Sequence, residues 1–70
     1  MSKIAAVMAG NVYQLLVKPG DQVEAGQNVA VLESMKMEIT ITAGSGGTVK
    51  EVLVSEGDFV NEGDLLIELD

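Results

Sequence analysis

GNVYQLLVKPGDQVEAG at residues 10–26 and GTVKEVLVSEGDFVNEG at residues 47–63 are two copies of one pattern. A shift of 37 positions aligns residues 10–33 with residues 47–70. Nine of the aligned pairs are identical, and most are turn glycines or strand valines and leucines: Gly10/Gly47, Val12/Val49, Leu16/Leu53, Val17/Val54, Gly20/Gly57, Asp21/Asp58, Val23/Val60, Gly26/Gly63 and Leu32/Leu69. Two copies are too few for a solenoid. The repeat therefore predicts two half-domains packed face to face about a pseudo-twofold axis.

Each copy of the pattern predicts short β-strands separated by turns. Val, Leu and Ile are frequent, and the spacing typical of an amphipathic helix is missing. Pro19 presets φ for a turn, and Gly20 accepts the positive φ that a type II turn needs next. The predicted strands are residues 1–9, 12–17, 21–23, 28–33, 38–42, 49–54, 59–60 and 65–69. They predict an all-β fold, a flattened sandwich or barrel.

The predicted core consists of the apolar positions that the two copies share. These are Val12, Leu16, Val23 and Leu32 together with Val49, Leu53, Val60 and Leu69. Ile39 and Ile41 alternate with polar residues, so both are expected to face inward. The apolar triplets at residues 15–17 and 52–54 break this alternation, which indicates strands buried on both faces or a bulge.

Length and residue types argue against an independent enzyme. The chain has 70 residues, 47% of them hydrophobic, which predicts one globular domain over residues 1–70. So small a core leaves little room for a deep pocket. Because cysteine and histidine are absent from the sequence, it offers no disulfide, no thiolate and no imidazole base. The acidic residues within 58–64 lack the spacing of a calcium loop, so no metal site is expected.

The charge balance narrows the range of partners. Eleven acidic residues and four lysines give a formal net charge of −7, which repels nucleic acids and anionic membranes. The aromatic residues are Tyr13 and Phe59, too few to stack bases. No apolar run approaches the ~20 residues of a membrane span, and the apolar stretch near the start is short for a signal peptide. The sequence predicts a cytoplasmic protein with no nucleic-acid or membrane partner.

One lysine differs in its setting from the other three. The segment Glu33-Ser34-Met35-Lys36-Met37-Glu38 joins two strand-like runs, so Lys36 is expected at a hairpin tip, exposed and firmly flanked. Methionine is an unusual turn residue, yet Met35 and Met37 flank Lys36. From the residues alone two interpretations stay open. Lys36 is either a functional amine or a solvated charge whose neighbouring methionines fill the core.

The segment Glu33–Met37 resembles the biotin attachment sequence of biotinyl domains, usually E-A-M-K-M. The resemblance covers essentially the whole chain, because residues 6–12 are similar to the family's A-P-M-x-G-x-V and residues 17–23 to its V-x-x-G-D-x-V. It implies a barrel-sandwich hybrid, a flattened β-barrel of two four-stranded sheets with the modified lysine on a tight hairpin. Ser34 replaces the usual alanine, and prolines common at positions 7 and 44 are missing. The thumb inserted in some acetyl-CoA carboxylase carriers is expected to be absent.

The resemblance implies a swinging-arm carrier and not an enzyme. A biotin protein ligase would join biotin to the amine of Lys36, and Glu33, Met35, Met37 and Glu38 are expected to contribute to ligase recognition. A lysine amine is protonated at neutral pH, so the proton must be removed in the ligase site. The carried biotin would then take a carboxyl group from a biotin carboxylase to a carboxyltransferase.

Lipoyl domains are the main alternative, because they are similar in fold and repeat structure. Their hairpin tip usually reads D-K-A or D-K-V, whereas residues 35–37 read M-K-M here, which in this family favours biotin. In the alternative, a lipoate ligase would be the partner and acyl transfer the function. Modification by both ligases and an unmodified interaction domain also stay open.

Overall fold

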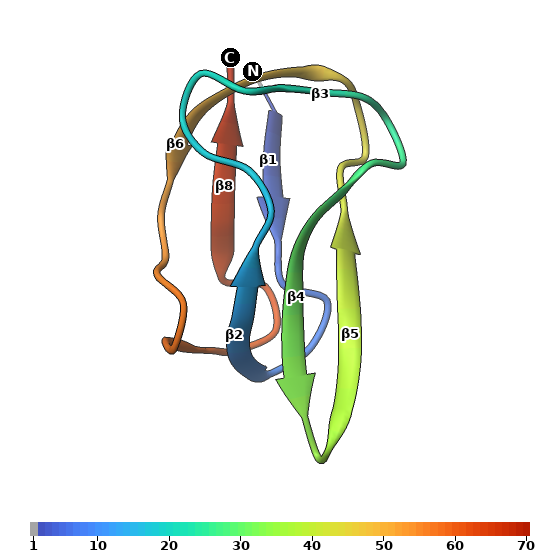
Figure 1. Ribbon diagram of the computed structural model, residues 1–70, viewed down its shortest axis with the longest axis vertical. Coiled ribbons are helices and arrows are strands. Elements are labelled where there is room, and N and C mark those ends of the chain that lie inside the picture. Colours follow the sequence, from blue (N-terminus) through green and yellow to red (C-terminus); the bar gives the residue numbers. More distant parts are fainter. Residues whose placement is uncertain (1) are drawn as a thin grey trace.

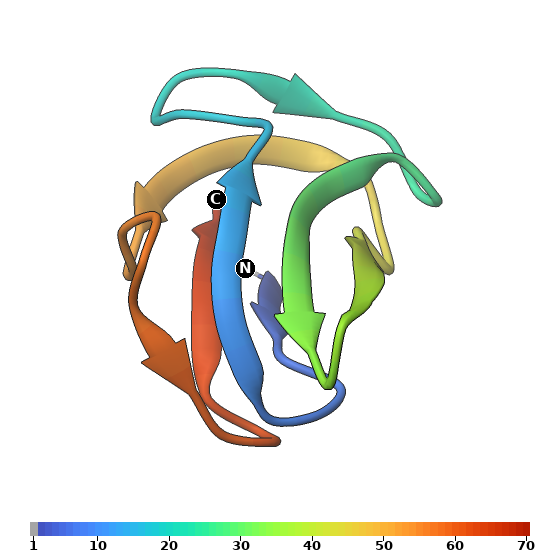
Figure 2. The same ribbon diagram turned by 60° about the horizontal axis from the view of Figure 1, so that its bottom comes forward.

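The computed structural model describes residues 2–70, and its regular structure is entirely β-strand. The strands are β1 Ser2–Ala5, β2 Gly10–Leu15, β3 Gln22–Val23, β4 Asn28–Ser34, β5 Met37–Thr42, β6 Gly47–Val52, β7 Phe59–Val60 and β8 Leu65–Leu69. They form two four-stranded sheets, in the orders β1-β8-β6-β3 and β5-β4-β2-β7 (Figures 1 and 2). The predicted all-β fold with two four-stranded sheets is confirmed. Residues 2–70 contain no helix of the length and apolarity that a membrane crossing requires.

The internal repeat relates the two sheets strand by strand. The shift of 37 residues carries β5, β4, β2 and β7 onto β1, β8, β6 and β3, which lie in the same order across their sheet. Bulges also fall at equivalent places, since the register shifts between Val12 and Gln14 in β2 and between Val49 and Glu51 in β6. The two halves therefore agree, as predicted, in the order of their strands and in the positions of their bulges.

Equivalent turns of the two halves are closed by the same side-chain hydrogen bond. Asp21 Oδ2 accepts a hydrogen bond from the backbone N–H of Lys18 at 3.0 Å. Asp58 Oδ2 accepts the equivalent bond from the N–H of Ser55 at 2.8 Å. Gly20 precedes the first of these aspartates with a φ of 95°, and the glycine of the second turn has 97°. The repeated Gly-Asp pair thus supplies a left-handed backbone and an acceptor that closes the turn.

Most strand limits lie within two residues of the prediction. β7 and β8 begin and end where expected, and β4 and β5 each extend one residue further toward the hairpin that joins them. β2 and β6 lie two residues earlier than expected, because the glycines that open them are paired within the sheets, Gly10 opposite Val60 and Gly47 opposite Val23. The largest difference is the first strand, expected over residues 1–9, which ends at Ala5; Met1 lies outside the described residues.

A single hydrophobic core fills the space between the sheets, and none of the described residues with a polar or charged side chain is buried in it. Ile41 is buried and Ile39 packs against the core half-buried, as the alternation of β5 predicts. Six of the eight predicted core positions are buried, with exposures of 4% or less: Val12, Val23, Leu32, Val49, Val60 and Leu69.

The prediction that Leu16 and Leu53 are core residues is wrong. Their exposures are 47% and 41%, and both lie just after a bulged strand at equivalent positions. The bulge in β2 leaves Tyr13 and Gln14 both on the outer side, so the residues that follow alternate in the opposite sense. Val17 consequently points inward, with 8% exposure, and Leu16 points outward. The expected bulge exists but precedes the apolar triplet.

Leu16→Ala and Leu53→Ala are therefore expected to change the free energy of unfolding by less than about 1 kcal/mol each. Each side chain already contacts water over two fifths of its surface or more, so truncation leaves no closed cavity. Chemical denaturation of the two variants beside the wild type measures the change. A loss of about 3 kcal/mol in either variant would show that these leucines are buried.

Candidate functional site

The β4–β5 hairpin is the longest projection of the molecule and ends in a two-residue loop. Ser34 is paired with Met37, which leaves Met35 and Lys36 as the two loop residues. Figure 1 shows this tip at one end of the long axis, with the start of β1 and the end of β8 at the opposite end. The predicted position of Lys36 at a hairpin tip is thus what the structure shows. The amine is presented away from the body of the domain.

Met35 and Lys36 occupy a backbone conformation that their side chains disfavour. Their φ values are 52° and 65°, and they are the non-glycine residues with positive φ among residues 2–70. Positive φ at both loop positions is typical of a type I′ hairpin turn, which ordinarily selects Asn-Gly. For L residues this conformation costs about 1–2 kcal/mol each. The cross-strand pairing of β4 with β5 holds the turn, so the lysine Cα has a defined position and direction.

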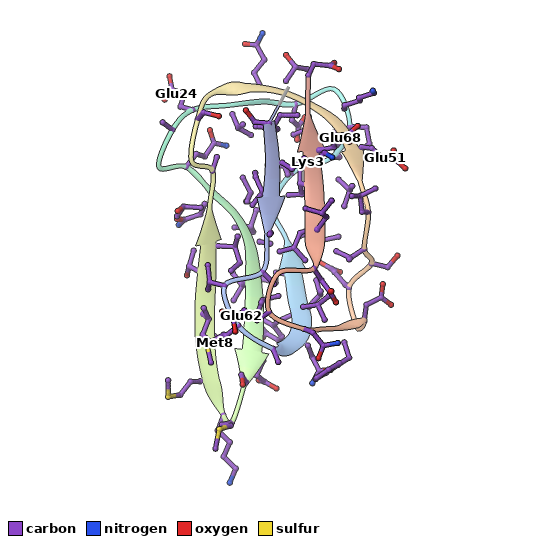
Figure 3. All side chains as sticks on the ribbon, turned by 180° about the vertical axis from the view of Figure 1, so that it is seen from behind. Lys3, Met8, Glu24, Glu51, Glu62 and Glu68 are labelled. Atoms are coloured by element: carbon purple, nitrogen blue, oxygen red, sulfur yellow. The ribbon has the colours of Figure 1, made fainter. Side chains whose placement is uncertain are left out.

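The methionines beside Lys36 do not fill the core. Met35 is 91% exposed and Met37 is 61% exposed. The interpretation of these residues as core filling is therefore wrong, because the tip extends beyond the region that the two sheets enclose (Figure 3). Lys36 is exposed as well, and the ion pair found among residues 2–70 joins Lys50 to Glu68 instead. The tip combines an exposed amine with two flexible apolar side chains in water.

Gly10 fixes the base of the hairpin against β2. A Cβ atom at this position would lie 2.8 Å from the carbonyl oxygen of Glu33 and 3.3 Å from Cβ of Ser34. Only glycine permits β2 to approach the end of β4 this closely. In the sequence, Gly10 stands out as a repeat position and as part of the family resemblance over residues 6–12. Because the expected strand begins at residue 12, the pattern did not indicate that Gly10 lies within β2, where glycine marks a close approach.

Two of the predicted recognition residues face each other just behind the tip. Glu33 in β4 is paired with Glu38 in β5, and both side chains are exposed. Like charges directly opposite each other destabilise a pair of strands. The described residues provide neither carboxylate with a salt bridge. The structure therefore brings Glu33, Met35, Lys36, Met37 and Glu38 together at one end of the molecule.

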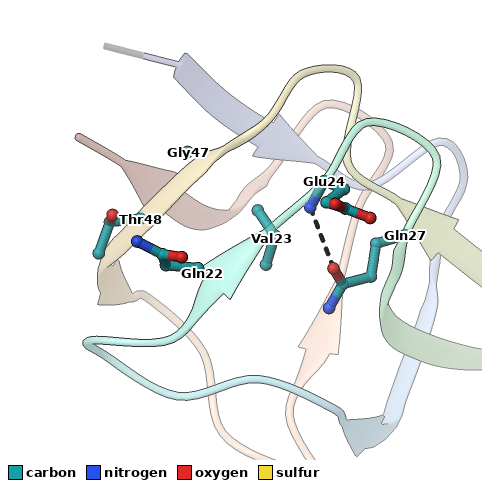
Figure 4. A pocket seen from close by; sticks show the side chains of 6 residues that line it. All are labelled: Gln22, Val23, Glu24, Gln27, Gly47 and Thr48. Carbon is teal, nitrogen blue, oxygen red and sulfur yellow. Dashed lines mark hydrogen bonds between the residues drawn. The ribbon is translucent and has the colours of Figure 1, made fainter.

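A pocket lies at the other end of the molecule. It has a volume of about 420 Å³ and is lined by Gln22, Val23, Glu24, Gln27, Gly47 and Thr48. Within it the backbone N–H of Glu24 donates a hydrogen bond to Oε1 of Gln27 at 3.0 Å (Figure 4). Glu24 is the one carboxylate in this lining. The pocket therefore lies far from the hairpin and holds no acid–base pair.

Chemically, the tip is an acceptor and not a catalyst. The Lys36 amine, once deprotonated, is a nucleophile that forms an amide with an activated carboxyl group. No second side chain at the tip can take its proton in a water-excluded site, because the whole hairpin end is exposed. The tip fits a covalently attached group, since the backbone beneath it is held and the amine is open to solvent. The fold and the tip together define a carrier domain that presents an exposed lysine at the end of a hairpin.

Comparison with known proteins agrees with this class. The biotin/lipoyl family model, described as "Biotin-requiring enzyme", matches residues 1–69. The chain is 62% identical over 66 residues to the biotin/lipoyl attachment protein of Bacillus subtilis, covering 94% of this chain and 90% of that protein. It is also 51% identical over 69 residues to the human mitochondrial propionyl-CoA carboxylase alpha chain, covering 99% of this chain but only 10% of that one.

Two solved structures show the same fold. Kluyveromyces lactis urea carboxylase matches with a TM-score of 0.91 and 32% identity, over 99% of this chain and 6% of that chain. The lipoyl domain of the Azotobacter vinelandii 2-oxoglutarate dehydrogenase complex matches with a TM-score of 0.74 and 30% identity, over 91% of this chain and 81% of that domain. The chain belongs to the biotin/lipoyl attachment family. Domains of this family are non-catalytic carriers, and the expectation that this chain is not itself an enzyme is confirmed.

Proposed function

We propose that Lys36 carries biotin and that the domain moves carboxyl groups between the active sites of a biotin-dependent carboxylase. The observation that carries the proposal is the exposed Met35-Lys36-Met37 tip on a strained two-residue turn. When bound, biotin supplies a ring nitrogen that accepts and releases the carboxyl group. The side chain of the modified lysine would reach about 15 Å from the backbone at ordinary bond lengths. The chain's own contribution is to hold the base of that arm still.

Loading the carrier is an acyl transfer in which this chain is the substrate. In a biotin protein ligase, the neutral Lys36 amine would attack the carbonyl carbon of a biotinyl-adenylate. The new C–N bond forms as the C–O bond to the phosphate breaks, which releases AMP, and the amine proton passes to a base of the ligase. The product amide is neutral, so the tip loses its positive charge. Glu33 and Glu38 would attract a basic ligase surface, and Met35 and Met37 would give it apolar contact.

Biotin is favoured over lipoate by the residues beside the lysine. In lipoyl domains the tip usually carries an acidic residue before the lysine and a small one after it, whereas Met35 and Met37 are both large and apolar. The strong similarity to the propionyl-CoA carboxylase alpha chain supports the same choice. The partners under this proposal are a biotin protein ligase, a biotin carboxylase and a carboxyltransferase in the cytoplasm. A lipoyl carrier, or a domain accepting both groups, is the second candidate, supported by the lipoyl-domain match.

Intact mass measurement tests the proposal directly. The 70-residue chain is co-expressed with a biotin protein ligase and, separately, with a lipoate ligase, and the intact mass of each product is measured. The proposal predicts one biotinyl group per chain with the first ligase and little modification with the second. Complete lipoylation without biotinylation would establish the alternative instead.

Met35→Asp combined with Met37→Ala rebuilds a lipoyl-type tip and is expected to switch the ligase. Both side chains are solvent-exposed, so the free energy of unfolding should change by only about 0.5 kcal/mol. The rate of biotinylation should fall to a small part of the wild-type rate, and the rate of lipoylation should increase or stay the same. The two ligation rates are measured beside a melting curve. Unchanged biotinylation would show that the methionines do not determine the choice of cofactor.

A further inference from the structure

The two aromatic residues of the chain lie together on an outer face. Tyr13 is 51% exposed and Phe59 is 63% exposed. Phe59 in β7 is paired with Asn11 in β2, and Tyr13 lies two residues further along β2. Residues so placed are diagonal neighbours, within reach of aromatic side chains. We call these two side chains, on the outside of sheet β5-β4-β2-β7, the aromatic face.

The internal repeat shows that the fold does not require aromatic residues at these positions. The shift of 37 residues places Lys50 opposite Tyr13 and Gln22 opposite Phe59 in the alignment. Both equivalents are exposed on the other sheet, where Lys50 makes an ion pair with Glu68 at 3.5 Å. Lys3, Glu51 and Glu68 lie over the same sheet (Figure 3). At these matching positions, one sheet thus carries a lysine and a glutamine, whereas the other carries two aromatic side chains.

The charged residues on the four strands of this sheet are all acidic. The four strands of sheet β5-β4-β2-β7 contain no lysine or arginine. Register places Phe59, Asn11, Glu33 and Glu38 in one row across the sheet. Asp58 directly precedes Phe59, and Glu56 Oε2 accepts a hydrogen bond from the backbone N–H of Leu15 at 3.0 Å. The aromatic face is therefore an apolar centre with an acidic rim, and its complement is an apolar depression flanked by Lys and Arg side chains.

We infer that the aromatic face binds the biotin protein ligase that loads Lys36, an inference that rests on the proposed function. The reason is the length of the unmodified side chain. A lysine amine lies only about 6 Å from its Cα, so a ligase must approach the body of the carrier closely. Enzymes that act on the loaded arm work about 15 Å away and have no such need. The ligase is thus the partner that must approach the hairpin and the strands behind it most closely.

The distances along the sheet place the aromatic face inside an interface of ordinary size. The Glu33 row lies three residues behind Lys36, which is about 10 Å along the strand. Phe59 lies two strands to the side of Glu33, again about 10 Å. A standard interface covers roughly 800 Å² per partner, equivalent to a disc about 16 Å in radius. Centred on the tip, such a disc includes Phe59. Tyr13, about 17 Å from the tip by the same spacings, lies just beyond its edge.

A second copy of this chain is the less suitable occupant. Two copies meeting on this face would bring together two acidic rims on chains that each carry a net charge of −7. A basic ligase surface instead gains from the same charges, which increase the rate of encounter at low salt. Tyr13 and Phe59 are also of the residue types that provide much of the binding energy of protein interfaces.

Steady-state ligation tests the inference with variants matched by the repeat. The double variant Tyr13→Gln with Phe59→Gln is compared with Lys50→Gln with Gln22→Ala at the equivalent positions of the other sheet. The probe is a purified biotin protein ligase with biotin and ATP, and the initial rate is followed against carrier concentration. The first variant is expected to lose about fivefold or more in kcat/KM through KM, with kcat at saturation unchanged. The second should stay within about twofold of the wild type.

Equal kcat/KM for the two variants and the wild type would overturn the inference while leaving the proposed function intact. The inference would also be overturned if sedimentation showed that the wild-type chain is a dimer and that Tyr13→Gln with Phe59→Gln makes it monomeric. Melting curves confirm that each variant is folded. The single variant Phe59→Leu keeps an apolar side chain, so it should recover most of the kcat/KM that Phe59→Gln loses. A wild-type chain that no biotin protein ligase modifies would overturn the proposed function as well.

Discussion

Lys36→Arg is expected to abolish biotinylation completely and to leave the fold as stable as the wild type. Arginine keeps the positive charge and the long side chain at the exposed tip, but its guanidinium stays protonated and offers no nucleophilic amine. Intact mass after co-expression with the ligase measures the loss, and thermal melting measures the fold. The expected outcome is an unmodified chain with an unchanged melting temperature.

Lys50→Arg is the matched control for this experiment. Lys50 is exposed on β6, at the bulge between Val49 and Glu51, and forms an ion pair with Glu68. The control should be biotinylated as fully as the wild type, because the hairpin tip that carries Lys36 is unchanged. Biotin found on Lys3, Lys18 or Lys50 in the Lys36→Arg variant would contradict the assignment of a single attachment site.

Leu32→Ala and Leu69→Ala are each expected to lower the free energy of unfolding by about 2–5 kcal/mol. The two leucines occupy equivalent positions of the repeat and are 0% and 1% exposed. Truncation removes buried methyl groups and leaves a cavity that two tightly paired sheets can close only in part. For a chain of 70 residues the whole free energy of unfolding is only about 4–10 kcal/mol, so either variant loses a large share.

Denaturant unfolding followed by circular dichroism measures these losses, with Leu16→Ala and Leu53→Ala as controls of the same chemistry at exposed positions. The four variants separate burial from residue type, because all remove the same atoms. Wild-type stability in Leu32→Ala and Leu69→Ala would contradict a core shared equally by the two halves. Equal losses in all four would contradict the outward orientation of Leu16 and Leu53.

Much of the candidate site could be predicted because its signals are local. The run from Glu33 to Glu38 has strand-forming residues on both sides, so a hairpin with Lys36 at its tip follows from pattern alone. The exposure of Met35 and Met37 was not decided by pattern, because methionine occurs both in cores and on binding surfaces. Only the length of the hairpin relative to the barrel shows that these side chains extend past the core.

The sequence by itself determined the repeat, the turns, the number of strands and the position of Lys36 at a hairpin tip. Each of these depends on short-range chemistry, such as the positive φ of Gly20 or the carboxylate of Asp21 that closes the same turn. What only the tertiary structure decided is which side of each strand faces the core after a bulge. One extra residue in β2 reverses the alternation and turns Leu16 outward. Tyr13 and Phe59 likewise become neighbours only because β7 pairs with β2 from more than forty residues away, and pairing over that distance depends on how whole sheets pack.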